Sequence, residues 1–316
     1  MNHHHKKYLF VYGPVASRRL KRSLGVDLVP FKTCSYNCVY CQIGKTKKCT
    51  LDRMEYMPVQ GILEELREKL KSAAPPNYIG LAGSGEPTLH SRIGEIIEGI
   101  KALTDIPVAV LTNGSFLWKP EVRAGLAGAD LVLPSLDAGS AEVFHCINRP
   151  HPDITFDKMV NGLVDFSHAF QGRIHLEVFI VKGINDSVDS VKQIAAITKD
   201  MRLDRVDLNT VSRPPAENVT ASPFEALESM CTIFPCDTRV IAETHRTMIA
   251  THQSASAESD IVALLNRRPC TIEGVAKGLG LHPNEVVKHL DVLHSRGVIR
   301  AVRSNEAVFY EGIWTA

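Results

Sequence analysis

Apolar strand-like segments and amphipathic helical segments alternate along the first two thirds of this chain. The predicted strands are residues 25–31, 78–82, 108–112, 131–136, 174–181 and 206–211. Predicted helices lie at residues 58–72, 92–103, 120–126, 156–170 and 188–199. Such alternation is typical of a parallel sheet with crossover helices, so we expect an α/β fold. Six such strands with the helices between them predict a partial (β/α)6 barrel, in which the chemistry lies at the carboxyl ends of the strands.

The same pattern predicts four parts in the 316-residue chain. They are an N-terminal extension with a basic loop (1–24), the partial barrel (25–215), a helical segment and linker (216–257) and a small C-terminal domain (258–316). The basic loop runs through residues 17–22 and has two interpretations. Such a charge run either cradles an anion or is a solvated turn.

The composition argues against several classes of protein. The formal net charge of +1 at pH 7 gives no sign of a general nucleic-acid or anionic-membrane binder. No run approaches the roughly 18 apolar residues that span a bilayer, and the first residues lack the apolar core of a signal peptide. We therefore expect a cytoplasmic protein without membrane contact, whose eight cysteines are reduced thiols rather than a disulfide scaffold.

Three cysteines stand close together at Cys34, Cys38 and Cys41, in the spacing Cys-x3-Cys-x2-Cys. Three thiolates cannot complete a four-ligand site, so a metal centre bound by them keeps one position open. A [4Fe-4S] cluster held in this way has one iron free to take a ligand, whereas a cluster with four cysteines only carries electrons. A zinc knuckle that lacks one ligand and buried structural thiols are the alternatives.

This spacing, with Tyr40 just before the third cysteine, resembles the signature of the radical S-adenosylmethionine (radical SAM) superfamily. The resemblance covers residues 8–215 and is nearest to the Fe-S oxidoreductases related to wybutosine-type tRNA-modifying enzymes. It implies a partial barrel of the radical SAM type, a [4Fe-4S] cluster on the three cysteines, and SAM chelated to the open iron. It also implies that an electron from a flavodoxin or ferredoxin cleaves SAM to a 5'-deoxyadenosyl radical, which abstracts hydrogen from a substrate.

The second predicted strand ends in a glycine-rich turn, Gly83-Ser84-Gly85-Glu86-Pro87. Glycines allow a ligand to approach the backbone closely, and proline fixes the direction in which the chain leaves. The turn resembles the Gly-Gly-Glu-Pro element that meets the SAM amino group in the superfamily, with Ser84 as the departure. The resemblance therefore places this turn in the cofactor site.

The later strand ends also carry polar or glycine residues: Asn113, Ser135, Asp137, Gly183, Ile184 and Asn185. The resemblance assigns Ser135 and Asp137 to the ribose or carboxylate of SAM and the turn at Gly183 to adenine. Taken singly, each residue fits a helix-capping or turn role equally well. Because the carboxyl ends of parallel strands meet at one edge, all of them together with the cysteines predict one cofactor site.

The C-terminal domain has a different pattern of three short helices followed by a hairpin, which resembles a winged helix-turn-helix. Such domains usually place a helix in DNA, but residues 258–316 contain seven acidic residues and seven arginines or lysines. A phosphate-binding face needs a positive surplus. We therefore expect a protein, peptide or RNA partner rather than a DNA site.

Two other functions fit parts of the sequence. A redox-responsive regulator would use the cluster to switch a DNA-binding winged helix, but it has no use for residues 83–87. A protein-modifying activase or maturase would dock its partner through residues 258–316. Cys231 and Cys236 are candidates for a second cluster, with buried or incidental thiols as the alternative. Two cysteines alone are insufficient for such a cluster, and none of Cys49, Cys146 and Cys270 extends a recognisable run.

Overall fold

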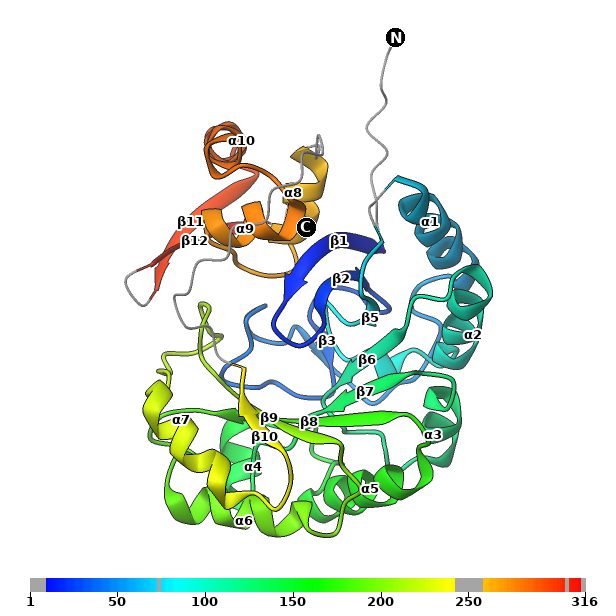
Figure 1. The fold of residues 1–316 in the computed structure, drawn as a ribbon, viewed down its shortest axis with the longest axis vertical. Coiled ribbons are helices and arrows are strands. Elements are labelled where there is room, and N and C mark those ends of the chain that lie inside the picture. The colour runs from blue at the N-terminus through cyan, green and yellow to red at the C-terminus, as the bar shows by residue number, and fades with distance from the viewer. Residues whose placement is uncertain (1–9, 73–74, 242–257, 305–306, 314–316) are drawn as a thin grey trace.

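The structure, a computed structural model, describes residues 10–72, 75–241, 258–304 and 307–313. Figure 1 shows a curved sheet with helices around its outer side and a small C-terminal domain next to its first strands. In the described residues the sheet has eight strands, in the order β1-β2-β5-β6-β7-β8-β9-β10. The β1–β2 pair is antiparallel and every other neighbouring pair is parallel. The predicted α/β fold is confirmed.

The strands of this sheet are β1 (Val11–Ser17), β2 (Lys21–Val26), β5 (Tyr78–Leu81), β6 (Val108–Thr112), β7 (Leu131–Pro134), β8 (Arg173–Ile180), β9 (Arg205–Thr210) and β10 (Thr238–Val240). A two-stranded sheet in the cysteine loop consists of β3 (Thr33–Cys34) and β4 (Lys48–Cys49). The helices of the barrel are α1 (Val59–Ser72), α2 (Ile93–Leu103), α3 (Pro120–Leu126), α4 (Ala141–Ile147), α5 (Phe156–Ala169), α6 (Val188–Thr198) and α7 (Phe224–Met230), with short 3-10 turns η1 (Pro87–Leu89) and η2 (Cys231–Ile233).

The helices form because their apolar residues recur at helical spacing, and three of them also have a capped first turn. In α2 the buried positions are Ile93, Ile96, Ile97 and Ile100, which is one face of a helix. Side-chain oxygens cap the first turns of α4, α5 and α6, from Ser140, Thr155 and Ser187. No helix within the described ranges has the length and apolar character needed to cross a membrane.

The start of the sheet differs from the sequence prediction. Residues 8–23, predicted as a loop before the first strand, contain β1 and the beginning of β2, and the basic residues form the turn between them. The strand predicted at 25–31 ends at Val26. There Asp27 leaves the strand direction to accept a hydrogen bond from the backbone N–H of Ser84 (2.6 Å), and Pro30 has no N–H for a ladder. The described part of the predicted N-terminal extension therefore contributes β1 and the beginning of β2 to the sheet.

The sheet also continues past residue 215, where the barrel was predicted to end. After α7, β10 adds in parallel to β9, with Thr238 opposite Val206. The predicted linker around residues 254–257 lies outside the described residues. Helix α4, which lies between β7 and α5, was not predicted.

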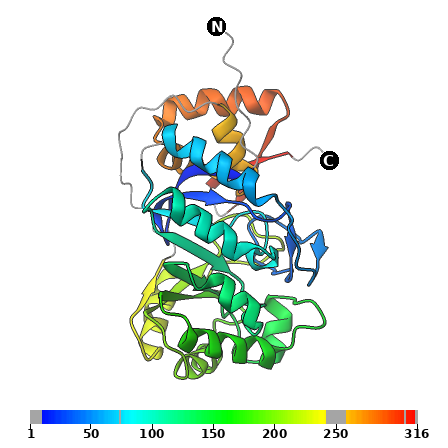
Figure 2. The ribbon, with the colours of Figure 1, turned by 90° about the vertical axis from the view of Figure 1, so that its right-hand side faces the viewer.

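The C-terminal domain has the predicted three helices and hairpin: α8 (Glu258–Leu265), α9 (Ile272–Leu279), α10 (Pro283–Ser295), β11 (Ile299–Ser304) and β12 (Ala307–Gly312). Its relation to winged helices stays a prediction. Figure 2 shows this domain stacked on the β1 end of the barrel. Tyr12 and Val15 of β1 belong to the same apolar cluster as the domain's own buried residues. Lys69 of α1 also pairs with Asp260 of α8 at 2.7 Å. The two parts therefore share a core.

Candidate functional site

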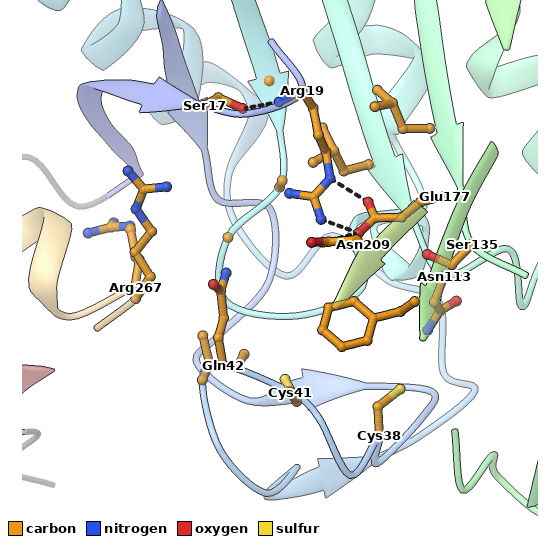
Figure 3. A pocket seen from close by; sticks show the side chains of 18 of the residues that line it. Ser17, Arg19, Cys38, Cys41, Gln42, Asn113, Ser135, Glu177, Asn209 and Arg267 are labelled. Atoms are coloured by element: carbon orange, nitrogen blue, oxygen red, sulfur yellow. Dashed lines mark hydrogen bonds and ion pairs between the residues drawn. The ribbon is translucent and has the colours of Figure 1, made fainter. Parts of the chain in front are cut away.

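One cavity of about 310 Å³ lies between the cysteine loop and the ends of the sheet strands. Cys34, Cys38 and Cys41 all line it, and each is a free, partly buried thiol. Figure 3 shows Cys38 and Cys41 together on one side of this cavity. The structure therefore brings the three predicted metal ligands to the same wall.

The cysteine loop is fixed to its neighbours through the backbone. The N–H of Asn37 donates to the carbonyl of Asn148 at 3.1 Å, directly after α4. On the other side, Thr33 bridges to Gly85 in the glycine-rich turn. A Cβ on Gly85 would lie 1.8 Å from the carbonyl oxygen of Thr33, so only glycine permits this contact. The turn and the cysteine loop are thus locked together.

Glu86 follows this turn and is almost fully buried, with 2% of its surface exposed. Its carboxylate accepts hydrogen bonds from the backbone N–H of Thr88 (3.0 Å), the hydroxyls of Thr88 and Thr112 (2.5 and 2.6 Å) and the backbone N–H of Asn113 (2.7 Å). Burial raises the pKa of Glu86, although these donors oppose the shift. Glu86 therefore ties the glycine-rich turn to the end of β6 at the cavity wall.

The glycine-rich turn is also held from the C-terminal domain. Asp27, which accepts the N–H of Ser84, forms an ion pair with Arg267, and 5% and 8% of these two side chains are exposed. The guanidinium of Arg267 lies over the ring of Tyr12, 4.7 Å from its centroid. Gly83 has φ +148°, and a Cβ there would lie 1.9 Å from Asp27 Oδ1. This contact between distant segments was not predicted from the sequence, because neither residue belongs to a motif.

Asn113 and Tyr40 stand at the cavity next to the cysteines. The side-chain amide of Asn113 donates to Ser35 Oγ at 2.9 Å and lies 3.5 Å from Cys34 Sγ. The ring of Tyr40 stacks on Phe179 of β8, with centroids 3.9 Å apart and planes 10° from parallel. Ser135 lines the same cavity. These three predicted site residues therefore lie in one place with the cysteines.

Asp137 lies behind this wall and does not line the cavity. It accepts hydrogen bonds from the hydroxyl of Tyr40, the amide of Asn148 (2.7 Å) and the backbone N–H of Phe179 (2.9 Å). Burial raises the pKa of Asp137 to about 6, against these three donors. Asn148 in turn lies 3.6 Å from Cys38 Sγ. Asp137 was predicted to contact SAM directly. In this structure its carboxylate instead holds the side chains of Tyr40 and Asn148 in place beside the cysteines.

Five other predicted site residues are also absent from the cavity lining: Ser84, Pro87, Gly183, Ile184 and Asn185. Asn185 is fully buried. Its amide donates to the carbonyls of Asp137 and Phe179 (2.8 Å each), and its oxygen accepts the N–H of Val181 at 2.7 Å. This side chain thus connects the segments that follow β7 and β8. That is the turn role predicted from the sequence as the alternative to cofactor binding.

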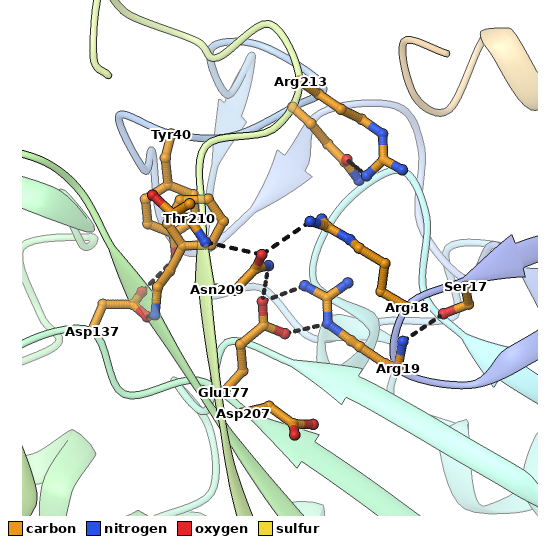
Figure 4. Close-up of polar contacts among 12 residues, drawn as sticks. Ser17, Arg18, Arg19, Tyr40, Asp137, Glu177, Asp207, Asn209, Thr210 and Arg213 are labelled. Atoms are coloured by element: carbon orange, nitrogen blue, oxygen red, sulfur yellow. Dashed lines mark hydrogen bonds and ion pairs between the residues drawn. The ribbon is translucent and has the colours of Figure 1, made fainter. Parts of the chain in front are cut away.

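A partly buried ion pair lines the cavity, between Arg19 in the β1–β2 turn and Glu177 of β8 (Figure 4). Arg19 binds both carboxylate oxygens of Glu177 through Nε and Nη2. Asn209 of β9 donates to Glu177 at 2.8 Å and accepts from Arg18 at 3.1 Å. The basic loop therefore reaches across to β8 and β9. A carboxylate within the otherwise apolar strand 174–180 is the sequence signal for this pair.

The cysteine wall fits a [4Fe-4S] cluster. Its three cysteines lie around one cavity, as a cluster with three protein ligands requires. The hydroxyl of Tyr36 is buried at the same wall and has no hydrogen-bond partner in the described part of the chain. A sulfur atom there would satisfy it. Across the described ranges, no three His, Cys, Asp or Glu side chains form a group that holds a single metal ion.

Comparison with known proteins gives the class of this chain. Residues 28–196, more than half of its length, match the family model described as Radical SAM superfamily. The chain therefore belongs to the radical SAM superfamily, whose members are enzymes. Its cofactors are accordingly a [4Fe-4S] cluster and SAM.

Two relatives match almost the whole chain. A UPF0026 protein of Helicobacter pylori is 34% identical over 302 residues, which cover 94% of this chain and 96% of that protein. The GTPase Obg of Brachyspira hyodysenteriae is 40% identical over 303 residues, which cover 95% of this chain but 45% of that protein. This chain thus spans less than half the length of the second relative.

Solved structures show the same fold at low sequence identity. A radical SAM methyltransferase from Sphaerobacter thermophilus has a TM-score of 0.54 and 14% identity, over 70% of this chain and 66% of that one. Streptococcus suis SuiB bound to S-adenosylmethionine has a TM-score of 0.50 and 14% identity, over 70% of this chain and 47% of that one. The radical SAM type of fold is confirmed.

Proposed function

We propose that this enzyme cleaves SAM reductively and removes a hydrogen atom from a substrate bound in the same cavity. One electron from a reductant breaks the bond between sulfur and the 5' carbon, giving methionine and a 5'-deoxyadenosyl radical, which becomes 5'-deoxyadenosine when it takes the substrate's hydrogen. The observation that carries the proposal is that Cys34, Cys38 and Cys41 share one cavity with Gly83, Gly85 and Glu86.

The chain's own residues would divide the work as follows. The cysteines would hold the cluster with one iron open. The Gly83–Gly85 turn lines the same cavity and would contact the SAM amino group there. Asn113 and Ser135 present polar atoms to the cavity. Leu111, Leu133 and the Tyr40–Phe179 stack give it apolar surface, which limits water around a reactive radical.

Two kinds of partner follow from this proposal. The electron donor would be a small redox protein such as a flavodoxin or ferredoxin. The C-terminal domain would dock a protein, peptide or RNA partner through α10, where Glu285, Lys288 and Asp291 are all exposed. Because charges of both signs share this surface, it does not resemble a phosphate-binding helix.

Anaerobic reconstitution with iron and sulfide, followed by reduction in the presence of SAM, tests the proposed function. We expect 5'-deoxyadenosine from the wild type and none from Cys38→Ala. Cys146, exposed on α4, provides the matched control, since Cys146→Ala removes a thiol that does not line the cavity. Absence of 5'-deoxyadenosine with the wild type, or equal amounts with Cys38→Ala, would refute the proposal.

A further inference from the structure

Two buried polar side-chain atoms lack a hydrogen-bond partner in the described part of the chain, and both residues line the same cavity. One is the hydroxyl of Tyr36 at the cysteine wall. The other is Nε of Arg268, which comes from the C-terminal domain. A buried donor that is left unsatisfied costs free energy, roughly 1–3 kcal/mol and more for a charged group. Such an atom at a cavity wall therefore points to a ligand that completes it.

Arg268 differs from its neighbour Arg267. The guanidinium of Arg267 is already used by Asp27, by the carbonyl of Ala263 (2.8 Å) and by the ring of Tyr12. Arg268 donates to the carbonyl of Ala16 at 3.2 Å through Nη2, and none of the ion pairs among the described residues includes it. Its charge thus has no carboxylate partner in the described ranges.

The surroundings of Arg268 are positively charged. The arginines that line the cavity are Arg18, Arg19, Arg213, Arg267 and Arg268, and the carboxylates that line it are Glu86 and Glu177. Arg19 neutralises Glu177, and Glu86 is surrounded by hydrogen-bond donors near the cysteines. A concave site with an excess of one charge raises the local concentration of ligands of the opposite charge.

The arrangement of Arg19 shows what Arg268 lacks. Nε and Nη2 of Arg19 bind the two oxygens of the Glu177 carboxylate side by side, which is the strong bidentate geometry of guanidinium and oxyanion. Nε of Arg268 has no such oxygen. Figure 3 shows Arg267, the residue before Arg268, across the cavity from Asn113 and Ser135. Arg268 lines the same cavity as the three cysteines, so a molecule bound to it through an oxyanion would lie in the cavity with them.

We propose that Arg268 binds an oxyanion, a carboxylate or phosphate group, of the substrate. The inference rests on the proposed function, since it places the substrate in the cavity that holds the cluster and SAM. The C-terminal domain then supplies a wall of the substrate site in addition to any docking role. Arg18 and Arg213 line the same cavity and increase its attraction for anions.

Isothermal titration of the anaerobically reconstituted protein with SAM bound tests the inference, with inorganic phosphate and acetate as separate probes. We expect at least one probe to bind the wild type, and Arg268→Gln to weaken that binding at least about 10-fold, or about 1.4 kcal/mol. Arg268→Lys keeps the positive charge but lacks the planar guanidinium, so its affinity for the probe should lie between those of the wild type and Arg268→Gln. Arg303→Gln removes an exposed arginine of the same domain and should bind as the wild type does.

The two probes separate the two sources of the oxyanion, because preference for phosphate indicates a phosphorylated substrate and preference for acetate a carboxylic acid. If neither probe binds the wild type, or if Arg268→Gln binds as tightly, the inference is overturned. Should Arg268→Gln fail to fold, Arg268→Lys decides, and wild-type affinity in that variant would count against a bidentate contact. The titration contains no reductant and measures binding alone. A negative result would therefore overturn the inference about Arg268 but would not contradict the proposed function, which is tested by the formation of 5'-deoxyadenosine.

Discussion

The two sides of the cavity are built in opposite ways. The cysteine wall, residues 34–41, is one short segment whose three thiols are fixed by local spacing. The C-terminal wall, Arg267 and Arg268, depends on contacts with the first hairpin, and the Arg267–Asp27 pair joins residues 240 positions apart. The cysteine wall would bind the cofactor common to the superfamily, and the C-terminal wall would bind what is particular to this enzyme. Local motifs thus indicate the chemistry shared by the superfamily, whereas the proposed substrate site depends on contacts between distant segments.

The largest expected effect is at the cysteine wall. Cys38→Ala removes one of three cluster ligands, so we expect iron content to fall and SAM cleavage to drop by more than the roughly 100-fold that loss of an outer-shell partner causes. Iron analysis and 5'-deoxyadenosine production measure both effects. A variant that keeps the wild-type iron content would show that the cluster does not depend on this wall.

Arg267→Met tests the C-terminal wall. It leaves the Asp27 carboxylate buried without its cation, which costs about 3–5 kcal/mol of unfolding free energy. Chemical denaturation measures this loss. Arg300→Met is the control, because Arg300 pairs with Glu311 at the surface, where such pairs contribute about 0–1 kcal/mol. Equal stability losses in the two variants would show that the Arg267–Asp27 pair stabilises the fold no more than a surface ion pair does.

The same variant has a predicted pH dependence. Burial raises the pKa of Asp27 and Arg267 opposes that shift, so the pKa rises further in Arg267→Met. A carboxyl group whose folded pKa is raised binds more protons in the folded state, and its cost grows as pH rises through the folded pKa. We therefore expect the difference in melting temperature from the wild type to shrink as pH falls from about 8 to 5. If the difference in melting temperature does not change with pH, the ionisation of Asp27 is not the cause of the destabilisation.

Gly85→Ala tests the join between the cysteine loop and the glycine-rich turn. The added Cβ would lie 1.8 Å from the Thr33 carbonyl oxygen, so the backbone must move. We expect a loss of about 1–3 kcal/mol of stability together with weaker SAM binding. Gly274→Ala, whose Cβ meets nothing closer than 3.4 Å, is the matched control. Unchanged SAM affinity in Gly85→Ala would show that the glycine-rich turn does not contribute to SAM binding.

Tyr40→Phe should have the smallest effect. It keeps the stack on Phe179 and removes one of three donors to the buried Asp137, a loss of about 0.5–1.5 kcal/mol. Tyr56→Phe, which removes an exposed hydroxyl bonded to a backbone carbonyl, should cost less. Thermal unfolding compares the two variants. A larger loss for Tyr56→Phe would show that Asp137 does not need the hydroxyl of Tyr40.

Local patterns predicted most of the barrel, and nine of the fifteen predicted site residues line one cavity. The alternating segments gave six parallel strands within a few residues of those observed, because strand and helix periods are local properties. The cysteines, Tyr40, Asn113 and Ser135 reach the cavity because strand ends of a parallel sheet meet at one edge. The first hairpin was read as a loop, because its charged turn hides two short strands. Asn185 was predicted to contact the cofactor, but its buried amide donates to two backbone carbonyls. No sequence motif reveals these hydrogen bonds.

The central claim is that three cysteines hold a cluster whose open iron faces the SAM site. Electron paramagnetic resonance of the reduced, reconstituted protein tests it directly when spectra are recorded with and without SAM. We expect a reduced-cluster signal whose g values change when SAM is added, because SAM would bind the open iron. An identical spectrum with saturating SAM would contradict it.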